Sequence, residues 1–520
     1  MNNQDKKLIT ACINENAIKL FSTSCEHPLD NDVVSQLKNL NEKLRDDDDD
    51  YQIYRHRKIV DQLWGSLLEK AIKCLRFYDT REPFTDKAEK TPIAYGIEDL
   101  KKYYEQYSDF ERVLYGTGKY YRDHVIHVFR TWLSGVELLT KNDGTCLNHI
   151  CIAEKDVPSE LTPAEKLSVW TLIALTHDLG YPLEKAKSII DITKKMVSTF
   201  ISNPDISMDL SFHGVQNYMN DYVVRLMSSK MIPRDEIRRA KKDDDIKPDD
   251  DKPYVARLQS KYYFKFQKSL ERNKHGILST LIIYKLLTYF LESDYSINED
   301  YGFSKEDCRQ FYIRREILRA IASHTCDDVY QMYMGSFSFL LRICDDTQEW
   351  GRKNISELYV KSNQTYELSD IDLKFNEQDK KQNECRITEQ IEVSDAASIR
   401  DLILRFRNQA IVYITIFRDG QDTANRDFSF YRQLKITTSG VTFALKLNIF
   451  QDKASCLSGE ISYVSTGATN EPYGKEFFKQ LQRDGDLKEY QLTIYDENDA
   501  NVDNSAPEHW RKGRFVLPLL

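Results

Sequence analysis

The sequence predicts a mainly helical bundle followed by a C-terminal α+β domain that is rich in strands. Apolar residues recur with helical periodicity through residues 60–360, whereas runs after about residue 365, such as VTFALKLNIF (441–450), have the composition of strands. The chain of 520 residues is also too long for one ordinary domain. We expect an N-terminal helical segment (1–60), a helical domain (61–362) and an α+β domain (363–520).

The helical domain contains several strongly apolar segments. Residues 125–136 carry apolar side chains on one helical face, and EKLSVWTLIALTHD (165–178) is apolar on nearly all sides, which predicts a buried helix. We expect Gly180 and Pro182 to end that helix. The charged stretch 241–252 is interpreted as a mobile surface insertion, and the acidic run 46–50 as a solvated loop. Further helices are predicted in HGILSTLIIYKLLTYFL (275–291), RREILRAIASH (314–324) and SFSFLLRICDDTQEW (336–350).

In the C-terminal domain, apolar and β-branched runs predict strands, and one helix is expected near Ala396–Phe406. The predicted strands are AIVYITIF (410–417), QLKITT (433–438), VTFALKLNIF (441–450) and YQLTIYD (490–496).

Composition argues against several classes of protein. The net charge of −9 does not favour a chain that coats nucleic acid. Ten cysteines without a CxxC pair fit a reducing cytoplasm rather than a disulfide framework. The first ten residues lack an apolar core, and no run approaches the roughly 20 apolar residues of a membrane span. We therefore expect a cytoplasmic protein with no signal peptide and no membrane segment.

Histidines and aspartates at the ends of apolar helices are the candidate functional residues. His177 is followed at once by Asp178, and the late apolar helix carries Asp345. Imidazole and carboxylate groups suit a divalent metal that keeps positions open for water and substrate. On separate helices of one bundle, such groups point into a shared cavity. Four of the ten histidines begin or end apolar helices: His127, His177, His275 and His324.

Three motifs in this order resemble the HD-domain superfamily of metal-dependent phosphohydrolases: YRDHVIHVFR, LTHDLGYP and LLRICDDTQEW. The resemblance covers about residues 120–352 and implies an HD-domain helical bundle. It also implies that the first metal ion is held by His127, His177, Asp178 and Asp345, with Asp178 bridging to a second ion where one binds. His127 is preferred to His124 because it lies deeper in the apolar stretch; His124 stays open as a ligand or as a supporting group.

The order of His275 and His324 resembles that of HD proteins with two metal ions, and the alternative is that both pack their helices or contact substrate. The resemblance implies one or two divalent ions, from among Mn, Fe, Zn, Mg, Ni and Co. Lys185 follows the dyad by seven residues and is the candidate for binding a phosphate, with ordinary surface charge as the alternative. The candidate catalytic residues are His177, Asp178 and Lys185.

The resemblance implies a phosphohydrolase that attacks a nucleotide or another small phosphate ester with metal-activated water. HDLGYP lacks both the following histidine of the triphosphohydrolases and the lysine that follows the glycine in cyclic-dinucleotide phosphodiesterases, so the substrate stays open. The alternative is a non-catalytic sensor that binds a nucleotide or metal and signals through its C-terminal domain to a partner. Assembly into a homo-oligomer is also left open.

Overall fold

The computed structural model divides the chain into two compact units. The helical unit comprises Met1–Val329, Gly335–Asp345 and Lys353–Ser356; the C-terminal unit comprises Tyr330–Met334, Asp346–Arg352 and Glu357–Leu520. The acidic run 46–50 and all of the insertion 241–252 except Lys252 lie outside the described residues. The structure describes residues 3–22, 27–45, 52–76, 96–117, 123–152, 157–202, 215–234, 252–291, 295–296, 301–326, 332–352, 365–375, 383–393, 402, 405–406, 408–410, 412–413, 428–438, 441–451, 457–465, 493–496 and 515–516.

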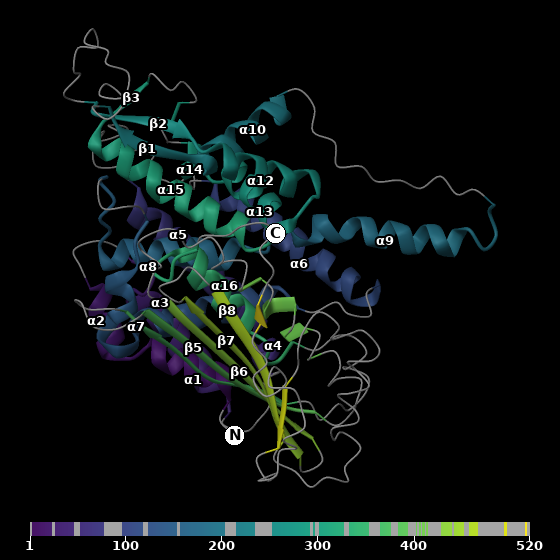
Figure 1. The fold of residues 1–520 in the computed structure, drawn as a ribbon. Coiled ribbons are helices and arrows are strands. Elements are labelled where there is room, and N and C mark those ends of the chain that lie inside the picture. Colours follow the sequence, from purple (N-terminus) through teal and green to yellow (C-terminus); the bar gives the residue numbers. More distant parts are fainter. Residues whose placement is uncertain are drawn as a thin grey trace. The chain divides into compact units, whose positions relative to one another are not determined.

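The structure is mostly helical, and Figure 1 labels the elements along the chain. Residues 1–60 group with the rest of the helical unit. Across the described helices of the whole chain, none has the length and apolar character needed to span a bilayer. The helices are α1 (Gln4–Cys12), α2 (Glu15–Phe21), α3 (Asn31–Lys43), α4 (Gln52–Arg55), α5 (Arg57–Leu75), α6 (Ile97–Thr117), α7 (Val125–His149), α8 (Pro163–Thr176), α9 (Tyr181–Val197), α10 (Val215–Ser228), α12 (Ser260–Glu271), α13 (His275–Leu286), α14 (Thr288–Leu291), α15 (Lys305–Ser323) and α16 (Phe337–Thr347).

The buried helix α8 (Pro163–Thr176) begins and ends two residues before the predicted segment 165–178. Thr162 and Glu165 form a reciprocal capping box, and Pro163 occupies the first turn. Its apolar side chains are buried on all sides, so the helix passes through the core of the unit. His177 caps its C-terminal end. The core therefore places the His177–Asp178 dyad at a fixed point.

Gly180 follows the dyad and is the N-cap residue of α9. A glycine is needed here because α13 packs closely against it, not because of its backbone conformation. Its φ is −81°, which any residue adopts, but a Cβ here would lie 2.4 Å from the carbonyl oxygen of His275. The Gly180 N–H also donates to the Ser279 hydroxyl at 2.8 Å. Pro182 lies in the first turn of α9 and so begins the next helix. Glycine thus lets the dyad pack directly against α13.

Helix α7 packs closely on α8. A Cβ at Gly135 would lie 2.0 Å from the Trp170 ring, and the Trp170 indole donates to the carbonyl of Trp132 at 3.0 Å. The helix is interrupted at Lys141–Gly144, where Asn142, Asp143 and Gly144 have positive φ. The segment that precedes this break carries His127.

Two sheets accompany the helices. The helical unit contains an antiparallel sheet in the order β1-β2-β3. The C-terminal unit contains a larger sheet in the order β10-β8-β7-β6-β5-β4, with β9 beside β8. Pairs β5–β6 and β8–β9 are parallel and the others antiparallel. The strands are β1 (Ser229–Pro233), β2 (Tyr254–Leu258), β3 (Gly302–Phe303), β4 (Thr365–Lys374), β5 (Asn383–Glu392), β6 (Phe428–Thr438), β7 (Val441–Gln451), β8 (Leu457–Ser465), β9 (Thr493–Asp496) and β10 (Phe515–Val516).

One predicted strand is wrong. The described residues of AIVYITIF, which are Ala410, Val412 and Tyr413, are helical. Ala410 and Tyr413 continue a buried series that begins with Leu402 and Phe406, at the spacing of one helical face. The β-branched composition suggested a strand. The buried residues recur every three or four positions from Leu402 onward, which is the spacing of a helix. The predicted strands at 433–438 and 441–450 lie within β6 and β7.

A buried ion pair attaches the N-terminal helix α1 to α7. The Arg130 guanidinium donates to both carboxylate oxygens of Asp5, at 2.8 and 2.7 Å, and both side chains are fully buried. Arg130 lies one turn after His127 on α7. Arg130 is the last residue of the first motif, YRDHVIHVFR, and its charge serves this internal pair.

We predict that Asp5→Ala lowers the free energy of unfolding of the helical unit by about 3–5 kcal/mol. The substitution removes the carboxylate that accepts two hydrogen bonds from a buried guanidinium. Urea denaturation followed by circular dichroism measures the change. The control is Glu98→Ala, which breaks the exposed Lys101–Glu98 pair and should cost less than about 1 kcal/mol. Equal effects of the two substitutions would contradict the prediction.

Candidate metal centre

The six predicted ligands come together inside the helical unit. His127 lies in the first turn of α7, His177 caps α8 and is followed by Asp178, and His275 begins α13. The remaining two ligands come from later helices, with His324 as the C-cap of α15 and Asp345 in α16. Overlapping groups of their ligand atoms lie within 4.8 Å of one another. Residues more than 200 positions apart in the sequence therefore form one cluster.

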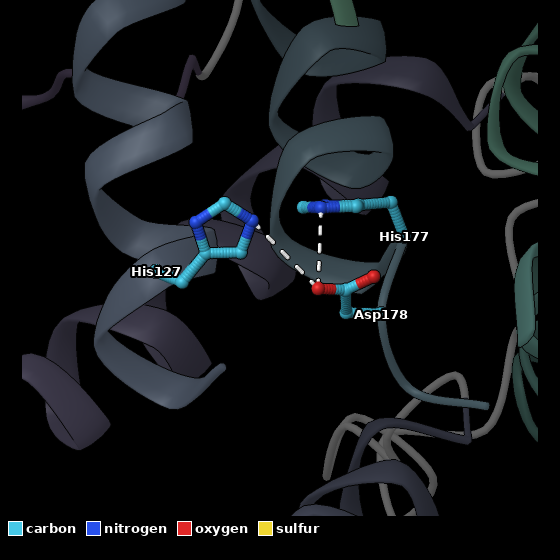
Figure 2. Close-up of side chains that lie close together, drawn as sticks. All are labelled: His127, His177 and Asp178. Carbon is cyan, nitrogen blue, oxygen red and sulfur yellow. Dashed lines mark ion pairs between the residues drawn. The ribbon is translucent and has the colours of Figure 1, made fainter. Parts of the chain in front are cut away.

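One carboxylate oxygen of Asp178 faces the first pair of histidines. Its Oδ2 atom lies 3.7 Å from Nε2 of His127 and 3.6 Å from Nε2 of His177. Figure 2 shows both rings directed at this carboxylate. Asp345 completes this side, with Oδ1 at 2.9 Å from His127 and 3.9 Å from His177. This group holds two imidazoles and two carboxylates.

The other carboxylate oxygen of Asp178 faces the second pair. Its Oδ1 atom lies 3.3 Å from Nε2 of His275 and 3.5 Å from Nε2 of His324. The two Nε2 atoms are 3.2 Å apart. Asp178 therefore stands between two pairs of imidazoles, and each of its oxygens faces one pair.

Three of the histidines are oriented through Nδ1. His177 and His324 pair this atom with the carbonyls of Ala174 and Ile321, at 2.8 and 2.5 Å. His275 pairs it with a carboxylate oxygen of Glu184 at 2.6 Å. Because these partners accept hydrogen bonds, Nδ1 carries a hydrogen in each ring, and Nε2 is the nitrogen that faces the cluster and is left to bind a cation. This is the tautomer that a metal ligand requires.

The donor set fits a divalent cation. Nε2 of His177 is buried and has no hydrogen-bond partner in the described part of the chain. The facing Nε2 lone pairs of His275 and His324 repel each other unless a proton or cation lies between them. Two atoms bound to one ion at about 2.1 Å each lie roughly 3–4 Å apart, which matches these separations. The buried His and Asp groups are thus positioned to hold a metal ion.

The electrostatics of the cluster also favour a cation. Burial alone would raise the pKa of the Asp178 carboxyl, but His177, His275 and His324 hold it well below its usual value. Burial would likewise raise the pKa of Asp345, and His127 and His177 lower it. Both carboxylates are therefore charged in a place where isolated charge is costly. Although burial opposes it, Asp178 raises the pKa of His177, and Asp178 and Glu184 raise that of His275 to about 9, whereas burial lowers the pKa of His324. A divalent ion can replace the protons that the first two rings bind.

The six ligands differ in their exposure to solvent. The side chains of His127, His177 and His324 are at most 2% exposed, whereas those of His275 and Asp345 retain 18% and 21%. His275 and Asp345 are therefore the two ligands of the cluster that keep contact with solvent.

Lys185 and His124 lie near the cluster but outside the groups of ligand atoms. The Lys185 ammonium lies 3.5 Å from Glu184 and 5.1 Å above the Tyr181 ring, and the side chain is 38% exposed. His124 is the N-cap residue of α7 and stacks on Tyr181, with ring centroids 3.8 Å apart. His127 rather than His124 therefore contributes to the metal-binding groups found among the described residues.

Glu184 is a functional residue that sequence reasoning missed. One of its oxygens accepts from both the backbone N–H and Nδ1 of His275, at 2.7 and 2.6 Å. Burial would raise the pKa of this carboxyl, but His275 and Lys185 lower it to about 2. An acid in the first turn of a helix is common, so its sequence position carries no distinctive signal. Its role depends on the approach of α13.

Two other contacts hold the ligand helices. The Ser279 hydroxyl donates to the carbonyl of His177 at 2.7 Å and joins α13 to the dyad. The Arg342 guanidinium donates to the carbonyl of His324 at 2.6 Å. Arg342 lies one turn before Asp345, so this bond connects the end of α15 to the middle of α16. Both polar side chains serve to position ligands.

Comparisons with protein-family models, with curated proteins and with solved structures find no match for this chain. The interpretation of the cluster therefore depends on its own geometry and chemistry.

We predict that Glu184→Gln weakens Mn²⁺ binding about 10- to 100-fold, the usual effect of losing a carboxylate that orients a histidine ligand. The amide loses the charge that favours the Nδ1–H form of His275. Isothermal titration with Mn²⁺ measures the affinity, and circular dichroism verifies the fold. Asp191→Asn changes an exposed carboxylate on the same helix and is the matched control. If both variants bind like the wild type, Glu184 does not orient a ligand.

Proposed function

We propose that the chain is a metal-dependent phosphohydrolase of the HD-domain superfamily that acts on a nucleotide or another small phosphate ester. The observation that carries the proposal is the Asp178 carboxylate, whose two oxygens face two separate pairs of histidines. This arrangement suits two adjacent divalent ions that share one carboxylate. The resemblance of the three motifs to HD proteins supports the same assignment.

In this proposal two groups of ligands, which share Asp178, bind one ion each. His127, His177, Asp178 and Asp345 would hold the first ion, and His275, His324 and Asp178 would hold the second. A bound divalent cation supplies a Lewis acid that neutralises phosphoryl charge and lowers the pKa of water. The first group has more carboxylate charge, so it should hold its ion more tightly. Manganese and iron suit such a mixture of nitrogen and oxygen donors.

The surroundings of the cluster assign roles to other residues. The phosphate group would approach beside His275 and Asp345, the two ligands whose side chains are partly exposed. Lys185 is exposed and its ammonium lies 3.5 Å from Glu184, so it would exchange this contact for a phosphate oxygen when substrate binds. Tyr181 stacks on His124 and contacts His275 edge-on at 5.2 Å, which stiffens the same rim. The buried His177 side excludes bulk water.

The second candidate function is a non-catalytic sensor in which the cluster binds a metal or nucleotide without hydrolysis. The separate C-terminal unit, with its own large sheet, is the observation that favours it. A panel of nucleotides, cyclic nucleotides and simple phosphate esters, tested with Mn²⁺, separates the two functions. Release of phosphate or a nucleotide product supports the enzyme; tight metal binding without turnover of any member supports the sensor.

We predict that Asp178→Asn lowers hydrolysis by several orders of magnitude, because the substitution removes the carboxylate charge shared by both ligand groups. The amide keeps the size of the side chain, so the helices should stay packed. Turnover of the best substrate of the panel is measured at saturating Mn²⁺, with Asp191→Asn as the control for an exposed carboxylate. Near wild-type turnover of a folded Asp178→Asn protein would place the active site elsewhere.

A further inference from the structure

Helix α16 carries a candidate metal ligand at the point where it passes from one compact unit to the other. Asp345 is the last residue of its segment in the helical unit, and Asp346–Arg352 group with the C-terminal unit. The helix continues to Thr347. A single peptide bond therefore joins a side chain of the metal cluster to a segment packed in the C-terminal unit.

Within the C-terminal unit, this segment is held by two side chains from one helical face. The Arg405 guanidinium pairs with the Glu349 carboxylate at 2.5 Å, and the Gln409 amide donates to the carbonyl of Asp346 at 3.4 Å. Arg405 and Gln409 are four residues apart and both helical, so they face the same way. The end of α16 and the turn after it are therefore attached at two points.

The surroundings of the segment are closed to solvent. Thr347, Gln348 and Trp350 are fully buried, and Asp346 is 8% exposed. The buried Arg432 of β6 pairs with Glu389 at 2.7 and 3.1 Å, and its charge also acts on Asp346. Because these residues are buried and bonded within the C-terminal unit, we expect the segment Asp346–Arg352 to follow any movement of that unit.

We infer that the C-terminal unit controls the metal centre by holding the end of α16, with Arg405 as a positioning residue for Asp345. The inference rests on the proposed metal centre. Metal–ligand distances tolerate deviations of only about 0.2 Å. Asp345 Oδ1 lies 2.9 Å from His127 and 3.9 Å from His177, so a small displacement of the helix end changes the first ligand group.

Of the two residues in the ion pair, Arg405 is the one that a ligand can reach from solvent. Arg405 is 29% exposed, whereas its partner Glu349 is 9% exposed. A ligand or protein that competes for the Arg405 guanidinium would release Glu349 and loosen the end of α16. Asp345 would then be less well placed, and metal affinity would fall. Binding of a ligand to Arg405 in the C-terminal unit would thus lower the affinity of the metal centre.

The test compares Mn²⁺ affinity of the full-length chain and three variants by isothermal titration, without substrate. Arg405→Ala should weaken binding roughly 5- to 10-fold, within the range of ordinary coupling between sites. Arg386→Ala removes the more exposed Arg386–Glu384 pair of the same unit and should leave affinity unchanged. The reversed pair Arg405→Glu with Glu349→Arg should recover most of the lost affinity. Circular dichroism and thermal unfolding verify that each protein is folded.

The outcomes separate this inference from the proposed function. If the wild type binds no Mn²⁺, both the metal centre and the coupling are overturned. If the wild type binds Mn²⁺ and folded Arg405→Ala binds equally well, only the coupling is overturned. Equal losses in Arg405→Ala and Arg386→Ala would also overturn it, because the effect would be general to the unit. A loss specific to Arg405→Ala, with recovery by the reversed pair, supports it.

Discussion

The interaction on which the helical unit depends is the contact of one buried carboxylate, Asp178, with four imidazoles. The Asp178 side chain is 6% exposed, and moving an ion of this kind out of water costs several kcal/mol even after relaxation. Hydrogen bonds and positive charge from neighbouring groups offset this cost. Those groups come from α7, α8, α13 and α15, so these helices must converge at one point. A fold that separated them would leave a buried charge without compensation.

The surrounding contacts make this convergence geometrically defined. Gly180 allows α13 to approach the dyad, and Ser279 joins the two by a hydrogen bond. Glu184 fixes the ring of His275, and Arg342 ties α16 to the end of α15. These four residues position the metal ligands or the helices that carry them. None of them supplies a ligand atom to the metal-binding groups found in the described residues. The cluster is therefore oriented before any cation arrives, which reduces the reorganisation needed for binding.

Much of the candidate site could be predicted because its residues are conspicuous in the sequence. Charged or ionisable groups at the ends of apolar helices, such as His177 and Asp345, are costly without a partner, so their positions are informative. Glu184 and the Asp5–Arg130 pair could not be predicted in the same way. Their roles depend on which helices meet in space, and local periodicity does not contain that information. The assignment of 410–413 as strand failed because β-branched composition was given more weight than the helical spacing of Leu402, Phe406 and Ala410.

The central claim is that Asp178 is shared by two cation sites, and crystallography with Mn²⁺ tests it most directly. Anomalous scattering at the manganese edge locates the ion independently of any assumed coordination. The account predicts one peak between Oδ2 of Asp178 and the His127–His177 pair, and a second between Oδ1 and the His275–His324 pair. Peaks absent from both positions, with the imidazoles still bonded to the carboxylates at the distances described above, would contradict it.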